Sequence, residues 1–246
     1  MTVASRIIHR LKPKPRQYTS YDEALAKCDG YEDADIVGTV YAKTVANRSL
    51  PLTSTNAFTL LSLLVGGRRV LDFGGACGIE YFNARRLLPA SQKLEWTVVE
   101  TPAMVARAAP LANAELRFAT SIDGLRPDVV HTSGTLQCVD DPLDHLQRLV
   151  DIGAEHMVFN RLGLSLGGQV VTIHESRLSE NGPGPMPAGM PDRLVRYPFV
   201  FPSREAFLGI LTQRYDVAAT FADDSGVFRV RGARLVGGGM VARLKA

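Results

Sequence analysis

One stretch, Val70–Gly78, constrains the fold of this chain more than any other part of the sequence. It begins with bulky apolar residues, contains one acidic residue and ends in a glycine-rich turn. Because Gly66–Arg69 interrupts the helical pattern before it, we expect a short buried strand over Arg69–Phe73. Helical spacing returns over residues 78–88. A strand, a glycine-rich turn and a helix together bring backbone close to a ligand and point the helix N-terminus at its polar end, so the stretch favours a nucleotide-binding turn.

The spacing of the small residues discriminates between nucleotide ligands. A dinucleotide fingerprint requires G-x-G-x-x-G, and no glycine stands at the sixth position counted from Gly74. Instead, an acidic residue precedes three closely spaced small residues, which resembles motif I of class I S-adenosylmethionine (SAM) methyltransferases. The resemblance implies a turn around the methionine part of SAM, formed by Asp72, Gly74, Gly75, Ala76 and Gly78, with Ala76 in place of the family's middle glycine. The alternative is an ordinary connection between a strand and a helix.

A second acidic residue, Glu100, ends the next apolar stretch, 28 residues after Asp72. Leu94–Glu100 has the composition of a strand, Thr101 suits a helix N-cap, and Pro102 suits the first helical position. A carboxylate at the tip of the second strand can accept hydrogen bonds from both hydroxyls of an adenosine ribose. We therefore expect Glu100 and Thr101 to lie at the cofactor. Alternatively, Glu100 only stabilises the helix start through the helix dipole.

The composition limits the class of protein. The chain has 246 residues, of which 46% are hydrophobic and 22% charged, enough for one globular domain with a sizeable core. No apolar run reaches the roughly 18 residues of a membrane span, and the N-terminus lacks the apolar core of a signal peptide, so we expect a cytoplasmic protein. Three widely separated cysteines argue against a disulfide framework or a zinc cluster, and we expect no metal site.

The charge is unevenly distributed. Residues 1–17 carry five basic residues and no acidic one, which leaves 23 basic and 25 acidic residues for the rest of the chain. A nucleic-acid-binding domain would show its basic stripe on the folded body, so a nucleic-acid partner is not expected. We interpret residues 1–17 as a flexible basic tail. The apolar Ile7, Ile8 and Leu11 leave contact with an anionic membrane surface as the alternative.

The remaining chain divides into an N-terminal helical segment or lid, residues 18–66, and a SAM-binding domain, residues 67–246. A capping box at Ser20–Glu23 opens a first helix that we expect to stop near Gly30. Apolar residues recur at helical spacing over Ile36–Val45, and Thr55–Val65 is a third, very apolar helix.

Beyond Glu100 the pattern alternates between strand and helix. We expect strands over residues 114–118, 127–133 and 155–160, and a helix that begins at Pro142. Repeated units of this length predict a parallel sheet with the ligand at its carboxyl edge. Ser121 and Ile122 follow the first of these strands, where the adenine would lie, and Ser133 ends the second and is also assigned to the cofactor.

The last third of the chain combines a long irregular stretch with a terminal hairpin. Residues 161–202 contain a cluster of glycine and proline, and we expect a functional loop there. Ser203 is predicted to cap a helix that runs to about Arg214. Tyr215–Phe221 then pairs with either of two segments, Gly226–Arg231 or Arg234–Leu244, and Gly237–Gly239 predicts a bulge or turn in the last strand.

Several of these segments together resemble a small bacterial family of methyltransferase-like proteins whose genes are often associated with surface polysaccharides. The resemblance covers roughly residues 17–246 and rests on Gly30–Tyr31, Leu71–Gly75, Val98–Glu100, Pro127–Val130, Leu136–Gln137, Asp141–Pro142, Asn160–Arg161 and Tyr197–Pro198. It implies an α/β fold with a Rossmann-like class I methyltransferase sheet, mostly parallel with an antiparallel C-terminal hairpin, and an N-terminal helical extension. It also implies a sugar or sugar-linked acceptor.

Three side chains are candidates for the acceptor side of the reaction. Gln137 follows the fourth strand and is placed to orient an acceptor or, alternatively, to cap a helix. Arg161 can bind a phosphate or carboxylate of the acceptor, or form an exposed salt bridge. His174 is a candidate general base or a solvated loop histidine, whereas His131 lies in an apolar strand and is interpreted as a hydrogen-bonded core residue.

The chemistry of the acceptor is limited by exclusion. Residues 132–135 read Thr-Ser-Gly-Thr and lack the Asn/Asp-Pro-Pro-aromatic motif of enzymes that methylate an exocyclic amine. The sequence therefore favours O-methylation of a small or carbohydrate-like acceptor. We expect its pocket between the N-terminal helices around Tyr41, the turn at residues 133–137 and the loop from Arg161 to Tyr197. A nicotinamide-dependent reductase and a non-catalytic binding protein with the same fold remain as alternatives.

Overall fold

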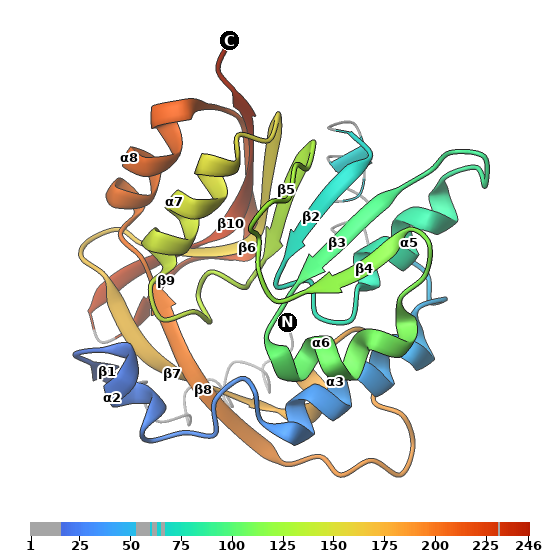
Figure 1. Cartoon of the computed structure of the whole chain (residues 1–246). Helices are drawn as coiled ribbons and strands as arrows, with labels where there is room; N and C mark the ends of the chain where they lie inside the picture. Colours follow the sequence, from blue (N-terminus) through green and yellow to red (C-terminus); the bar gives the residue numbers. More distant parts are fainter. Residues whose placement is uncertain (1–15, 53–59, 61–62, 65–66, 231) are drawn as a thin grey trace.

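The computed structural model describes residues 16–52, 60, 63–64, 67–230 and 232–246. A seven-stranded sheet forms its centre, with strand order β4-β3-β2-β5-β6-β10-β9 (Figure 1). The first five strands in this order are parallel, and β10 runs antiparallel to both of its neighbours. The strands are β2 (Arg69–Phe73), β3 (Glu95–Val99), β4 (Leu116–Ala119), β5 (Val129–Ser133), β6 (His156–Ser165), β9 (Tyr215–Val230) and β10 (Ala233–Leu244).

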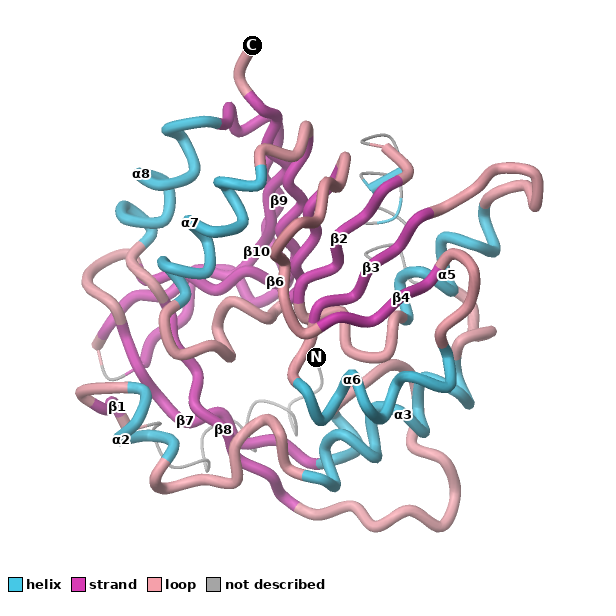
Figure 2. Tube along the Cα trace, in the orientation of Figure 1, coloured by secondary structure: helices cyan, strands magenta, loops and turns pink. Residues whose placement is uncertain are grey.

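Helices cover both faces of this sheet. Successive residues of a strand point to opposite sides, so each face presents its own apolar side chains to a layer of helices. Leu71 and Val130 pack with α7 (Pro142–Ile152) and α8 (Arg204–Arg214) on one face. Val70 and Val129 pack with α5 (Ile79–Leu87) on the other face. Figure 2 shows these helices as separate layers on either side of the strands. A sheet buried on both faces explains why its strands are short apolar runs rather than alternating ones.

The predicted elements around the glycine-rich turn are confirmed. β2 spans the predicted residues, α5 follows directly, and the next strand and helix are β3 and α6 (Pro102–Ala108), which continues into the short helix η1 (Ala109–Leu111). Thr101 caps α6 as expected, since its side chain accepts a hydrogen bond from the backbone N–H of Met104. The terminal hairpin pairs β9 with β10, so Gly226–Arg231 belongs largely to the first strand of the hairpin.

The prediction of an irregular loop over residues 161–202 is wrong. β6 continues to Ser165, and β7 (Val170–Arg177) and β8 (Leu194–Phe201) form a second, three-stranded antiparallel sheet with β1 (Gln17–Tyr18). Only the connection between β7 and β8, which includes η2 (Leu178–Glu180), carries the glycine and proline cluster. In Figure 1 the small sheet lies below the carboxyl ends of the parallel strands.

The N-terminal segment is integrated with this small sheet. The helix α2 (Tyr21–Leu25) packs on β7 and β8, and Ser20 accepts the N–H of Glu23 as the capping box predicts. The helix ends well before Gly30, which has φ +82° in the turn that follows. Because β1 begins at Gln17, the predicted tail boundary falls inside a strand. Residues 1–15 and most of the predicted helix 55–65 lie outside the described residues.

The connection between β7 and β8 is fixed to α3 (Ala34–Asn47), the helix predicted over Ile36–Val45. The ammonium of Lys43, which is 1% exposed, donates to the carbonyl of Ser179 over 2.6 Å. The amide of Asn47 donates to the carbonyls of Pro183 and Pro185, and Arg193 forms ion pairs with two acidic residues at the start of α3. The glycine and proline cluster is therefore a docked connection between two strands.

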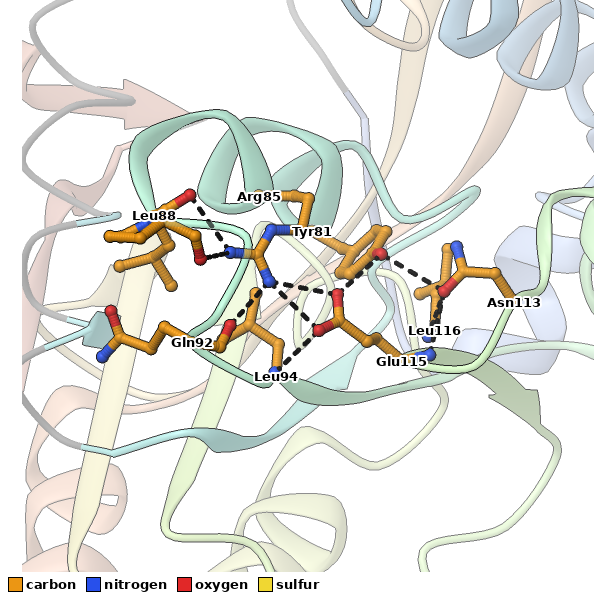
Figure 3. A network of polar contacts seen from close by, with 9 residues as sticks. Tyr81, Arg85, Leu88, Gln92, Leu94, Asn113, Glu115 and Leu116 are labelled. Atoms are coloured by element: carbon orange, nitrogen blue, oxygen red, sulfur yellow. Dashed lines mark hydrogen bonds and ion pairs between the residues drawn. The ribbon is translucent and has the colours of Figure 1, made fainter.

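A polar network ties α5 to the amino ends of β3 and β4, at the edge away from the glycine-rich turn (Figure 3). The carboxylate of Glu115 accepts from Arg85 at 3.0 Å, from the hydroxyl of Tyr81 at 3.1 Å and from the N–H of Leu94 at 3.1 Å. Arg85 also donates to the carbonyl of Gln92. Within the described residues, no helix is long and apolar enough to cross a membrane.

Candidate functional site

The turn between β2 and α5 adopts the conformation that its small residues suggest. Gly74, Ala76 and Gly78 all have positive φ, at 72°, 51° and 76°. The three small residues of the sequence pattern are thus the three left-handed positions of the turn. Glycine adopts this conformation freely, whereas alanine is strained by its Cβ. Ala76 therefore sits where the backbone geometry favours glycine.

Close packing explains the two glycines on the β2 side of the turn. A Cβ at Gly74 would lie 2.1 Å from the side chain of Thr135, in the turn after β5. A Cβ at Gly75 would lie 2.3 Å from the carboxylate of Asp72. Neither position can accept a side chain, so the backbone of the turn lies directly against its neighbours.

Asp72 lies beneath the turn. Its carboxylate is 1% exposed and is bound by the Nδ1 of His131 at 2.8 Å and by the indole N–H of Trp96 at 3.2 Å. The prediction that His131 is a hydrogen-bonded core residue is confirmed. Asp72, which was assigned to the cofactor, instead uses its oxygens to join β2, β3 and β5 under the turn.

Glu100 connects the turn to the start of α6. One carboxylate oxygen accepts the N–H of Ala76 at 3.1 Å, and the other accepts the N–H of Thr101 at 2.9 Å. Burial raises the pKa of Glu100 from 4.5 to about 7; the two backbone hydrogen bonds lower it, and Asp72 and Glu32 raise it. The structure thus brings together three residues predicted at the cofactor, at the point where the strand order reverses between β2 and β5.

The predicted adenine residues line a hollow beside these residues. Ile122 is buried, and the hydroxyl of the exposed Ser121 donates to Asp123 at 2.6 Å. The hollow opens between the ends of β2, β3 and β4 and the helix α7, and it is lined by Phe73, Val99, Thr120, Ser121, Ile122, His145 and Arg148. Its lining includes two aliphatic side chains, Val99 and Ile122, and the ring of Phe73, which suit a flat apolar group.

Three predicted site residues, Ser133, Gln137 and Arg161, meet at the carboxyl end of β5, where β6 extends beyond it. The guanidinium of Arg161 donates to the hydroxyl and the carbonyl of Ser133, both over 3.0 Å. The side chain of Gln137 is 4% exposed and donates to the carbonyl of Arg161 over 2.7 Å. Gln137 therefore lies under the backbone of Arg161, inside the protein.

His174 lies on a strand and not on a loop. It is in the middle of β7, exposed, with its ring 5.2 Å from the rings of Tyr197 and Phe199 on β8. Tyr41, the other predicted wall of the acceptor pocket, lies on α3, with the guanidinium of Arg107 on α6 4.4 Å from its ring centre. It packs against the same apolar cluster as Ala76 and Phe199.

Two functional candidates, Tyr31 and Phe199, were not identified from the sequence. Tyr31 lies between α2 and α3, with its ring edge-on to Tyr197 at 5.2 Å. Burial, and then the charge of Glu100, raise the pKa of Tyr31 well above its usual value, so its hydroxyl lies within electrostatic reach of Glu100. The aromatic run Tyr197–Phe201 was a strand signal that could have identified Phe199.

Comparisons with known proteins agree with this topology. No protein-family profile matches the chain, and no curated protein matches its sequence. Among solved structures, a sugar N-methyltransferase from Streptoalloteichus is 14% identical, with a TM-score of 0.51 over 84% of this chain and 93% of its own. An amino pentose methyltransferase from Micromonospora echinaspora with bound SAM is 14% identical, with a TM-score of 0.50 over 84% and 97%.

A third structure, a SAM-dependent methyltransferase from Clostridium acetobutylicum, is 9% identical, with a TM-score of 0.50 over 85% of this chain and 98% of its own. Identities this low establish the shared architecture only. The mixed α/β architecture, with a mostly parallel central sheet and antiparallel strands, matches that of these structures. The chain therefore has the Rossmann-like fold of class I SAM-dependent methyltransferases.

Proposed function

We propose that this protein is a SAM-dependent methyltransferase that acts on a small or carbohydrate-like acceptor. One observation carries the proposal: Glu100 accepts the backbone N–H of Ala76, so a ribose-binding carboxylate and a glycine-rich turn are joined at the carboxyl edge of the sheet. A carboxylate has about four acceptor sites, and the two bonds to Ala76 and Thr101 leave two for a pair of ribose hydroxyls.

The residues fit SAM from one end to the other. The left-handed turn over Gly74–Gly78 suits the close approach of a methionine group, and Glu100 suits the ribose. The hollow beside Ile122 suits the adenine, with its apolar lining against the ring faces. When bound, SAM supplies an electrophilic methyl group on a sulfonium. The protein has then to orient the acceptor for in-line attack and to accept the proton of a hydroxyl.

The acceptor side rests on Arg161 and His174. Arg161 lies on β6, and its guanidinium binds the end of β5 at Ser133, a residue of the proposed cofactor site, whereas His174 lies on β7, with its ring beside that of Tyr197 on β8. We propose His174 as the general base, and Gln137 as a positioning residue that holds the backbone of Arg161. O-methylation is favoured because residues 132–135 lack the Asn/Asp-Pro-Pro-aromatic motif that serves exocyclic amines. The N-methyltransferase activity of one structural neighbour makes the methylated atom a direct question for experiment.

Calorimetric titration separates this proposal from its alternatives. SAM and S-adenosylhomocysteine (SAH) should bind, and NADH should not. Labelled SAM should then transfer its methyl group to at least one member of a panel of sugars and sugar nucleotides. Binding of NADH without SAH would support the reductase instead. Binding of SAH without transfer to any acceptor in the panel would support a non-catalytic protein with this fold.

A further inference from the structure

Arg161 occupies a β-bulge that redirects its side chain. On β6, Phe159 pairs with Met240 and Leu162 pairs with Gly238, so two residues of β6 stand opposite Gly239 alone. Arg161 is one of the two, and its φ of +48° lies in the left-handed region. Bulges of this kind re-aim a side chain and are common beside functional sites.

Buried amides hold this strained backbone in place. The side chain of Gln137 donates to the carbonyl of Arg161 over 2.7 Å, and the side chain of Asn160 accepts its N–H at 2.9 Å. Both amides are more than nine-tenths buried, at 4% and 8% exposure. A non-glycine residue stays in a left-handed conformation only where its surroundings fix it, and such residues are concentrated at ligand sites.

The guanidinium of Arg161 has donors to spare. Its Nε and one terminal nitrogen hold Ser133, which leaves three of the five N–H groups for a ligand. Within the described part of the chain, no carboxylate forms an ion pair with Arg161, although Arg69, Arg85 and Arg177 each have one. An exposed arginine with a fixed position and free donors on one edge suits a bidentate carboxylate or phosphate.

An aromatic surface lies beside this cation. His174, Tyr197, Phe199 and Phe201 share one face of the small sheet, with neighbouring ring centres 5.1 to 5.2 Å apart. The N–H of Val200 donates to the backbone carbonyl of Gln137 over 2.7 Å, which fixes this part of β8 next to Arg161. His174 is exposed and Phe199 half-buried, so a ligand held by Arg161 can pack a ring against them.

We propose that Arg161 selects an anionic acceptor: a sugar or other small ring that carries a carboxylate or phosphate, with its ring packed on His174 and Phe199. This inference rests on the proposed methyltransferase function, because it places the acceptor opposite the SAM site. A carboxylate and a phosphate present the same paired oxygens to a guanidinium, so binding measurements with both kinds of probe decide between them.

The test measures the affinity of glucuronate, glucose 1-phosphate and neutral methyl glucoside for the protein in the presence of SAH. Arg161→Gly removes the guanidinium and suits the left-handed backbone, so the variant should fold. Arg161→Lys keeps the positive charge but loses the paired N–H donors of the guanidinium. Arg196→Gln is the matched control, because Arg196 is exposed on β8 and lies on the face opposite His174.

We expect at least one anionic probe to bind the wild-type protein and to lose affinity about tenfold or more in Arg161→Gly, with a smaller loss in Arg161→Lys. The affinity for neutral methyl glucoside should be the same in the wild type and in both Arg161 variants. Three results would overturn the proposal: no binding of either anion at about 10 mM, unchanged affinity in Arg161→Gly, or an equal loss in Arg196→Gln.

The cofactor's own carboxylate provides a further control. If Arg161→Gly weakens SAH but not 5′-methylthioadenosine, which lacks the amino-acid part, the arginine serves the cofactor and the proposal is wrong. If the wild-type protein binds an anionic probe but no SAH, the methyltransferase proposal fails while Arg161 remains an anion site. The two failures are therefore distinguishable.

Discussion

Replacing Glu100 by glutamine should weaken SAH binding in a way that depends on pH. The glutamine side chain keeps the size of Glu100 but has one acceptor oxygen, and its NH₂ group would face a backbone N–H of Ala76 or Thr101. Hydrogen bonds to a charged group contribute about 1.5 to 3 kcal/mol. Loss of those to the ribose should therefore raise the dissociation constant roughly 10- to 150-fold where Glu100 is ionised.

The pKa of about 7 gives this prediction its pH dependence. If only the carboxylate binds the ribose, SAH should bind roughly tenfold more weakly at about pH 6 than at about pH 8. The folded pKa lies above the ordinary 4.5, so the unliganded folded state binds more protons than the unfolded chain. The stabilisation of the folded state by protonated Glu100 is thus fully present below about pH 4.5, and it is lost as the pH rises through about 7. Glu100→Gln should remove both dependences.

Isothermal titration of SAH at several pH values measures the effect. Glu95→Gln is the matched control, since Glu95 is exposed at the other end of the same strand. We expect the SAH affinities of the wild type and of Glu95→Gln to have the same pH profile. Glu100→Gln should bind SAH weakly, with an affinity that does not change with pH. An unchanged affinity of Glu100→Gln at about pH 8 would mean that this residue only stabilises the start of α6, and the reasoning from the ribose would be refuted.

Three further predictions concern other parts of the molecule. Ala76→Gly should leave the free energy of unfolding unchanged or raise it by up to about 1 kcal/mol, because the relief of backbone strain at φ +51° offsets the greater entropy of the unfolded chain. The control Ala106→Gly, on the exposed face of α6, should lower the free energy of unfolding by about 0.5 to 1 kcal/mol. Urea unfolding of both variants measures the difference. Glu115→Ala should lower the free energy of unfolding, measured with urea, by about 1 to 2 kcal/mol. It should leave SAH affinity within about twofold, because the partners of Glu115 lie at the edge of the sheet away from the turn. A large loss of affinity would contradict that separation. Deleting residues 1–15 should also leave SAH affinity within about twofold, because every residue assigned to the site lies in the described part of the chain; lost binding would show a role for this segment.

The sequence was most informative where local chemistry alone determines structure. The turn over Gly74–Gly78 requires small residues at its left-handed positions, and Thr101 with Pro102 marks a helix start that needs no distant partner. The parallel sheet followed from the order of these units. These features account for the correct fold class and for the position of Glu100.

Long-range pairing and side-chain direction could not be predicted in the same way. β7 pairs with β8 across a connection rich in glycine and proline, and that composition concealed two strands whose β-branched and aromatic runs were visible at Val170–Ile173 and Tyr197–Phe201. Asp72 shares a strand face with Val70, toward α5, so its carboxylate points into the core. Gln137 was placed at the right turn, but only the bulge in β6 explains why its side chain supports the backbone of Arg161.

A crystal structure of the protein with SAH tests the central claim most directly. We predict that the two ribose hydroxyls lie within about 3 Å of the carboxylate of Glu100, with the homocysteine part along the turn over Gly74–Gly78 and the adenine in the hollow beside Ile122. A ligand bound elsewhere on the chain, or one whose ribose makes no contact with Glu100, would contradict the account.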